Sequence, residues 1–133
     1  MAPRIATVVF PSPDLAAGIA AWRTVFGAEP VWAGADFAAF RDGELEIGLT
    51  AAQWIDEPLV MLETDDIERS RRELIDGGAT GLGEIADGSM AELGTAPVTN
   101  GDPKTGIVDV PGARMAVVRL ANGNHLGLRQ PQP

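Results

Sequence analysis

The sequence predicts an α+β fold in which two βαβββ modules make up a single domain. Two observations lead to this prediction. Hydrophobic residues recur with a period of two residues in predicted strands and 3.6 in predicted helices. On this basis the order strand, helix, strands occurs twice along the chain. Asp14 and Asp66 lie 52 positions apart, and so do Trp22 and Leu74. A repeat at a fixed offset indicates an internal duplication, so within residues 1–133 the modules are expected at about 1–54 and about 55–133.

The first module starts with the apolar, β-branched strand 5–10 and continues into a helix. Ser12 is expected to cap this helix, with Pro13 in its first position and Gly27 at its end. One apolar stripe is expected along the helix, because its apolar residues are spaced four, three and four positions apart: Leu15, Ile19, Trp22 and Phe26.

Three short strands should complete the first module. They are expected near 30–34, 36–41 and 44–50. The pair Asp42-Gly43 has the composition of a hairpin turn and should join the last two.

The second module repeats this order. Its first strand is expected at 59–64, and Asp65 should cap a helix over 66–78, in which Glu68 and Arg72 are four apart. A closing hairpin is expected from 114–120 and 124–130, joined by the turn Asn122-Gly123.

Residues 85–113 depart from the repeat. They are rich in Gly, Pro, Asn and Asp, and they hold the only lysine, Lys104. We expect part of a strand near 89–93 and then a long loop. This loop is either a solvated excursion or a lid over a binding site.

Composition excludes several classes of function. The net charge is −9, so binding to nucleic acid or to anionic membranes is not expected. The chain has no cysteine, which excludes disulfides, thiolate metal sites and a cysteine nucleophile. No apolar run approaches the roughly 20 residues that a membrane span requires, and the first residues are too short for a signal peptide. A cytoplasmic protein is expected.

Three sequence segments, in this order and spacing, resemble the vicinal oxygen chelate superfamily, which includes glyoxalases, bleomycin-resistance proteins and extradiol dioxygenases. They are TVVFPSPDL, LVMLETDDI and LANGNHLGL, each with its following element. The last is similar to the family's Asp-Pro-Asp-Gly-Asn turn, with Leu120 and Ala121 in place of Asp-Pro. The resemblance implies a cupped mixed sheet with helices on its outer face, a small-molecule ligand on the concave face, and a homodimer.

The resemblance also identifies four positions where the family's metal enzymes place ligands. Here they are Thr7, Leu59, Gly127 and either Gly48 or, with the register slipped by two, Glu46. Catalytic metal sites need about three protein ligands with nitrogen or oxygen donors. Since at least two of these positions have no donor, we expect neither a metal nor another cofactor.

Three residues are candidates for acid-base chemistry: Glu63, Glu46 and His125. Because side chains alternate across a strand, His125 and Arg129 should share the face of Gly127, in the cup or at its rim. His125 is interpreted first as a hydrogen-bonding rim residue, then as a ligand contact, and last as a general base. The glutamates, if buried in an apolar cup, could act as bases; the simpler interpretation is that they pair with Arg129 or Arg119.

The same alternation predicts which other residues line the cup. On the first strand, Ile5 is expected to face the cup together with Thr7 and Val9. All seven aromatic residues lie within 10–54, and the outer ones could stack on a flat ligand. Phe37 and Phe40 are three apart, so only one of them should face the cup. The candidate ligand contacts are Thr7, Val9, Trp32, Phe37, Phe40, Trp54, Leu59, Met61, Glu63, His125 and Arg129.

The sequence therefore predicts a metal-free protein that binds a small, largely apolar or aromatic ligand, as antibiotic-sequestering members of the family do. The acidic composition favours a cationic ligand. The alternative is a lyase, isomerase or cyclase that uses Glu63, Glu46 or His125, or a metal enzyme with displaced ligands. A third possibility is a cup filled by the protein's own side chains.

Overall fold

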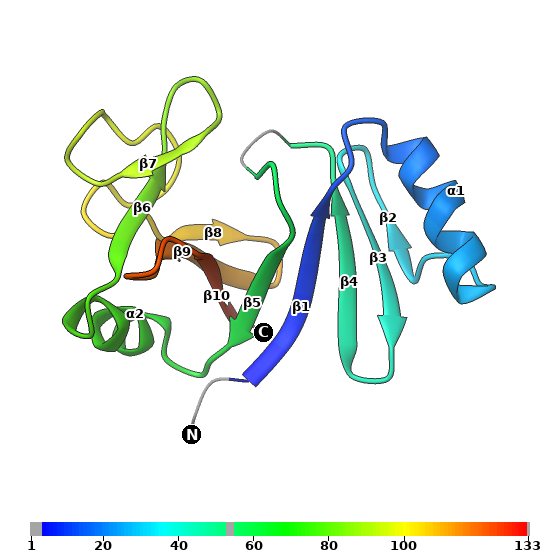
Figure 1. Cartoon of the computed structure of the whole chain (residues 1–133), viewed down its shortest axis with the longest axis horizontal. Helices are drawn as coiled ribbons and strands as arrows, with labels where there is room; N and C mark the ends of the chain where they lie inside the picture. Colours follow the sequence, from blue (N-terminus) through cyan, green and yellow to red (C-terminus); the bar gives the residue numbers. More distant parts are fainter. Residues whose placement is uncertain (1–3, 53–54, 133) are drawn as a thin grey trace.

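The computed structural model describes residues 4–52 and 55–132, which form two helices and one open ten-stranded mixed sheet. The α+β cupped sheet predicted from the sequence is confirmed (Figure 1). The helices are α1 (Leu15–Phe26) and α2 (Ile67–Asp76). The strands are β1 (Arg4–Pro11), β2 (Trp32–Ala33), β3 (Phe37–Asp42), β4 (Leu45–Thr50), β5 (Leu59–Glu63), β6 (Thr80–Glu84), β7 (Met90–Glu92), β8 (Val108–Val110), β9 (Ala113–Arg119) and β10 (His125–Pro131).

The sheet has two halves that meet in its centre. Its strand order is β2-β3-β4-β1-β5-β10-β9-β6-β7, and β8 pairs with β9 off this path. Strand β1 is parallel to β4, strand β5 is parallel to β10, and β1 and β5 are antiparallel to each other. Each half thus has the same internal pairing, and the antiparallel β1–β5 contact joins the halves into one continuous cup.

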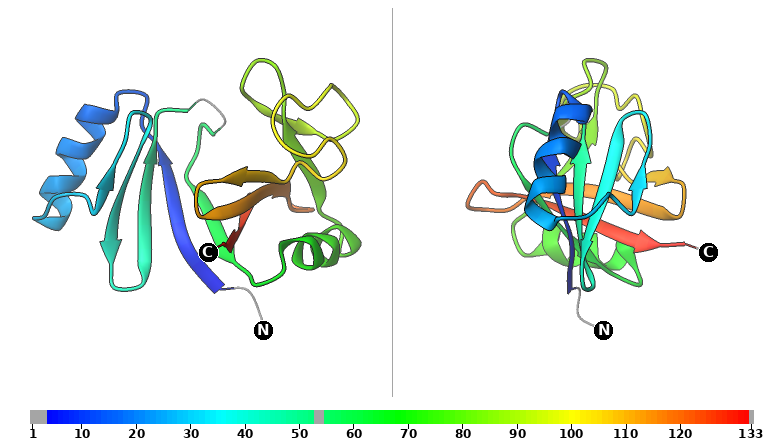
Figure 2. Two further views of the ribbon diagram at one scale, coloured as in Figure 1. Left: turned by 180° about the vertical axis from the view of Figure 1, so that it is seen from behind. Right: turned by 90° about the vertical axis from the view of Figure 1, so that its right-hand side faces the viewer.

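The helices lie at opposite ends of the molecule's long axis, each against its own half of the sheet (Figures 1 and 2). The stripe predicted on α1 packs against Phe10, Phe40 and Leu49. Ile67 and Leu74 of α2 pack with Leu128 on the other half. No helix among the described residues is long and apolar enough to cross a membrane.

Both helix N-caps lie away from the predicted residue. Asp14 caps α1 by accepting a hydrogen bond from the Ala17 N–H at 3.1 Å, so Ser12 does not cap it. Asp66 caps α2 in the same way, accepting from the Arg69 N–H at 3.1 Å, and Asp65 does not. Both capping aspartates have non-helical dihedral angles, φ −99° and ψ 93° at Asp14 and φ −146° and ψ 89° at Asp66, as an N-cap residue requires.

The ion pairs of α2 also differ from the prediction. Glu68 pairs with Arg114 of β9 at 3.1 Å rather than with Arg72. The pair four residues apart is instead Arg69 with Glu73, at 3.2 Å. Glu68 therefore forms its ion pair with a neighbouring strand and not with the next turn of its own helix.

Two strands were not predicted: β6, just before the segment 85–113, and β8, within it. Strand β6 directly follows α2, where no strand was expected, and β8 lies within the expected loop. The strand expected near 89–93 is confirmed as the short strand β7. The sequence of β6, TGLGE, is rich in glycine and has little β-propensity, and that of β8, VDV, is too short to show a pattern.

Candidate functional site

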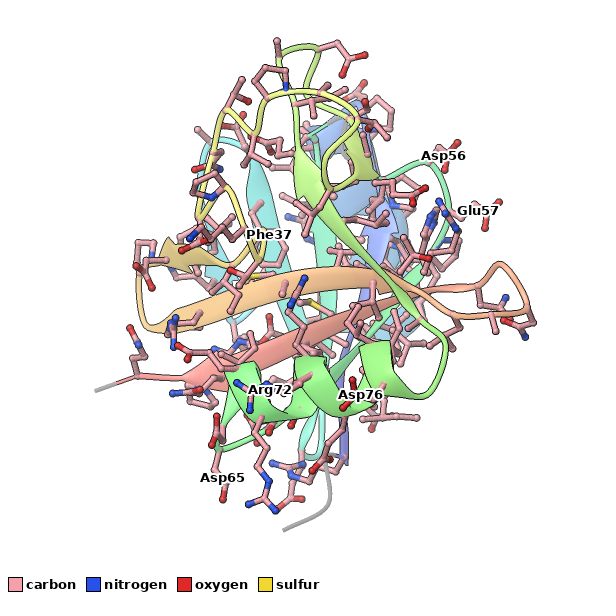
Figure 3. All side chains as sticks on the ribbon, turned by 90° about the vertical axis from the view of Figure 1, so that its left-hand side faces the viewer. Phe37, Asp56, Glu57, Asp65, Arg72 and Asp76 are labelled. Carbon is pink, nitrogen blue, oxygen red and sulfur yellow. The ribbon has the colours of Figure 1, made fainter. Side chains whose placement is uncertain are left out.

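The concave face of the sheet holds a cavity of about 660 Å³, which we call the main cavity. This volume lies within the usual range of small-molecule sites. All ten strands contribute residues to its walls, together with parts of the segment 100–111, and most of the lining is apolar. Of the predicted contacts, it is lined by Thr7, Val9, Trp32, Phe37, Met61 and Arg129. Phe37 lies inside the cup (Figure 3).

Two aromatic rings form one wall of the main cavity. The ring centroids of Trp32 and Phe37 are 6.1 Å apart, with the planes inclined by 45°. Trp32 is 56% exposed and lies at the edge strand β2. Phe40 points to the opposite face, where it stacks on Phe26 of α1 at 5.5 Å. Trp54 lies outside the described residues.

The pairing register identifies the four positions that correspond to the family's metal ligands. Gly127 pairs with Met61, and Gly48 pairs with Val9. Val9 and Met61 are equivalent in the repeat, being 52 positions apart, so the counterpart of Gly127 is Gly48 rather than Glu46.

Apolar side chains occupy the space over both glycines. The Phe37 ring covers Gly48, where an added Cβ would lie 2.7 Å from Cζ. Met61 covers Gly127, where an added Cβ would lie 2.8 Å from Cγ. Leu59 is buried in the cup floor and does not line the main cavity. Only Thr7 offers an oxygen donor, and no group of three His, Cys, Asp or Glu in 4–52 and 55–132 could hold a metal ion.

A smaller, polar pocket of about 260 Å³ adjoins the main cavity, and we call it the charged pocket. Glu63 pairs there with Arg4 at 2.8 Å and with Arg129 at 3.4 Å. Pairing with Arg129 was the simpler interpretation of this residue, and it is confirmed. The carboxylate of Glu63 is therefore held between two arginines in the charged pocket.

Glu46 and His125 differ in how they meet the cavities. The carboxylate of Glu46 is 21% exposed, lines both cavities, and has Arg41 at 3.9 Å as its ion-pair partner. His125 is exposed at the start of β10 and lines neither. Arg119, the other expected partner of a glutamate, pairs with Glu92 at 3.4 Å.

The long segment between β7 and β8 forms a wall fixed to the sheet. The Thr99 N–H donates to the Glu84 carbonyl at 2.9 Å. Gly106, at φ 72°, lies so close to the β6 backbone that an added Cβ would clash with the Leu82 carbonyl. Backbone N–H groups of Lys104 and Thr105 donate to the Asp102 carboxylate and hold its pKa below the usual range.

Sequence reasoning missed part of this lining. Met115 and Val117 of β9 face the main cavity, and the alternation in 113–119 could have placed them there. Val31, Met90 and Val108 also line it, but they lie beside or in two- and three-residue strands whose pattern is too short to read.

No protein-family model matches the chain, and no curated protein matches it. Solved structures do match over nearly its whole length. An NAD-dependent benzaldehyde dehydrogenase from Legionella pneumophila is 12% identical with a TM-score of 0.66, over 95% of this chain and 98% of the other. A glyoxalase/bleomycin resistance protein/dioxygenase superfamily member from Vibrio splendidus 12B01 is 11% identical with a TM-score of 0.59, over 98% and 100%.

A methylmalonyl-CoA epimerase from Streptomyces coelicolor, in complex with 2-nitronate-propionyl-CoA, is 15% identical with a TM-score of 0.62, over 98% of each chain. At such identities the likeness shows the fold alone. The chain therefore has a vicinal oxygen chelate fold, as the sequence resemblance predicted.

Proposed function

We propose that this protein binds a small molecule with an apolar or aromatic body in the main cavity, without using a metal ion. The observation that carries the proposal is the combination of a cavity of about 660 Å³ with apolar side chains over both glycine positions. Phe37 and Met61 stand where a metal site would need carboxylates. The lining that remains favours contact with an apolar surface.

The cavity would supply two kinds of contact to such a ligand. The Trp32 and Phe37 rings offer a face on which a flat group can stack. Met61, Met90 and Met115 offer flexible thioethers that adapt to an irregular apolar outline. We therefore expect moderate selectivity for shape and a preference for aromatic groups.

The neutral fluorescent dye N-phenyl-1-naphthylamine tests this proposal directly. The wild-type protein should bind it saturably at one site per chain, with quenching of tryptophan fluorescence. Trp32→Ala should weaken binding by about 1 kcal/mol, roughly fivefold, because an aromatic pair contributes that much beyond its buried area.

Trp22 provides the matched control for that substitution. It packs on Phe10 and Phe26 beneath α1, with ring centroids 4.9 Å and 5.9 Å away, and it does not line the cavity. Trp22→Phe should leave dye affinity unchanged while lowering the melting temperature. Equal affinities for the wild type and Trp32→Ala would remove the stacking wall from the proposal.

A second candidate function is an enzyme with Glu46 as its acid or base. The observation in its favour is that Glu46 lines the main cavity, with its ion-pair partner Arg41 at the long distance of 3.9 Å. A ligand that emerges chemically changed, and is no longer changed by Glu46→Gln, would favour this function over simple binding.

A homodimer and a cytoplasmic location complete the proposal. The family resemblance supports the dimer, and Val25 on α1, which is exposed and lines neither cavity, is an apolar residue open to a second copy. A dimer mass by light scattering at micromolar concentration is the expected result.

A further inference from the structure

The main cavity and the charged pocket share four residues: Thr7, Arg41, Glu46 and Arg129. Three of them follow one row across the sheet, because Arg41 pairs with Glu46 and Glu46 pairs with Thr7. Residues in register on neighbouring strands point to the same face. We call these four residues the junction; a ligand seated on the aromatic wall would have its polar end here.

The two arginines of the junction have donor capacity to spare. A guanidinium carries five N–H donors. Arg41 is 52% exposed and meets Glu46 at 3.9 Å, too far for a hydrogen bond. Arg129 meets Glu63 at 3.4 Å, while Glu63 already accepts a 2.8 Å hydrogen bond from Arg4. Neither arginine is therefore saturated by the contacts of the described residues.

The charges around the junction differ from the acidic balance of the whole chain. The charged pocket holds three arginines and three glutamates, although the chain carries a net charge of −9. Net charge does not locate a patch, and nearby groups dominate because salt screens charges beyond about 10 Å. A cation at Glu46 would have to approach Arg41 and Arg129 as well.

We propose that the ligand carries an oxyanion of the carboxylate type, which Arg41 and Arg129 bind at the junction while its apolar body lies on Trp32 and Phe37. This rests on the proposed function and names the chemical class of its ligand. Guanidinium groups match such anions because two N–H donors can meet two oxygens. The Thr7 hydroxyl, buried on the same row, is a further donor within the junction.

The test uses a pair of dyes that differ in one charged group. N-phenyl-1-naphthylamine is neutral, and 8-anilinonaphthalene-1-sulfonate has the same arylamine body with an added sulfonate. The measured quantity is anion selectivity, defined as the dissociation constant of the neutral dye divided by that of the sulfonate. Using a ratio cancels any change in the apolar part of the site.

Arg41→Gln and Arg129→Gln should each lower this selectivity about tenfold, which corresponds to 1.4 kcal/mol. Glu46→Gln should raise it, because the substitution removes the competing carboxylate and frees Arg41. The matched control is Arg72→Gln on α2, an exposed arginine remote from Phe37 that makes the same change of charge (Figure 3). It should leave the selectivity unchanged.

The outcomes separate this inference from the function on which it rests. Saturable binding of the neutral dye, with a selectivity that neither Arg41→Gln nor Arg129→Gln lowers, overturns the anion site alone. A fall in selectivity in Glu46→Gln also overturns it, since the carboxylate would then be assisting the sulfonate. Failure of both dyes to bind the wild type overturns the proposed function itself. Glu46→Gln keeps the test informative should an arginine variant not fold.

Discussion

Gly48 shows how a single missing side chain shapes this cavity. The Phe37 ring fills the space above it, and an added Cβ would lie 2.7 Å from the ring's Cζ and 3.0 Å from its Cε2. Gly48→Ala should therefore push the ring toward the cavity and lower the free energy of unfolding by about 1–3 kcal/mol, as overpacking does. Denaturant unfolding measures the loss, and a shift in Trp32 emission should accompany it.

Gly77→Ala is the control for that substitution. An added Cβ at Gly77 would meet the Glu73 and Leu74 carbonyls at 3.4 Å and 3.5 Å, close to ordinary contact. Its stability should stay near that of the wild type. If Gly48→Ala were equally harmless, the ring would not be seated as tightly on Gly48 as described.

Residue-level prediction from the sequence worked where the strand is regular and failed where it is not. Alternation placed Thr7 and Val9 correctly in the cup, because β1 pairs regularly with β4 there. It placed Ile5 there as well, but the pairing of β1 with β5 shifts register between Ile5 and Thr7. A bulge of this kind inserts one residue and turns the strand beyond it to the other face. Ile5 is accordingly 57% exposed.

The stability of helix α2 depends on its N-cap. Asp66→Ala removes the acceptor for the Arg69 N–H and should lower stability by about 1 kcal/mol, the usual contribution of such a cap. Asp65→Ala changes the exposed neighbour, for which no side-chain hydrogen bond is found in the described part of the chain, and should have little effect. Thermal unfolding of the two variants side by side distinguishes them. Equal losses would mean that the cap is shared or misplaced.

The elements that the sequence predicted well are those with long, periodic patterns. The β1, β5 and β9 strands and both helices lie within one or two residues of their expected ranges. Strand β6 was missed because its two glycines, Gly81 and Gly83, weaken the strand signal. Side chains of other elements lie over both glycines: added Cβ atoms would meet Arg71 at 2.5 Å and Leu93 at 2.8 Å. Sequence patterns do not report contacts of this kind.

For the molecule as a whole, the duplicated order of elements predicted two like modules, and the resemblance to the vicinal oxygen chelate superfamily predicted that they form one cupped sheet. The site was predicted less completely. The absence of donors at Leu59 and Gly127 was readable from the chain, whereas the choice between Gly48 and Glu46 required the strand register. That Phe37 and Met61 fill those places, and that two arginines gather beside Glu46, follows from the register between strands that lie far apart in sequence.

The central claim is that the cavity binds its ligand without a metal ion, and one titration tests it. The neutral dye N-phenyl-1-naphthylamine should bind with the same affinity and stoichiometry before and after dialysis against a chelator. Elemental analysis of the dialysed protein should find far less than one Zn, Fe, Mn or Ni per chain, because a site with Thr7 as its only donor cannot retain one. Affinity that is lost after chelation and restored by one of these ions would contradict the claim.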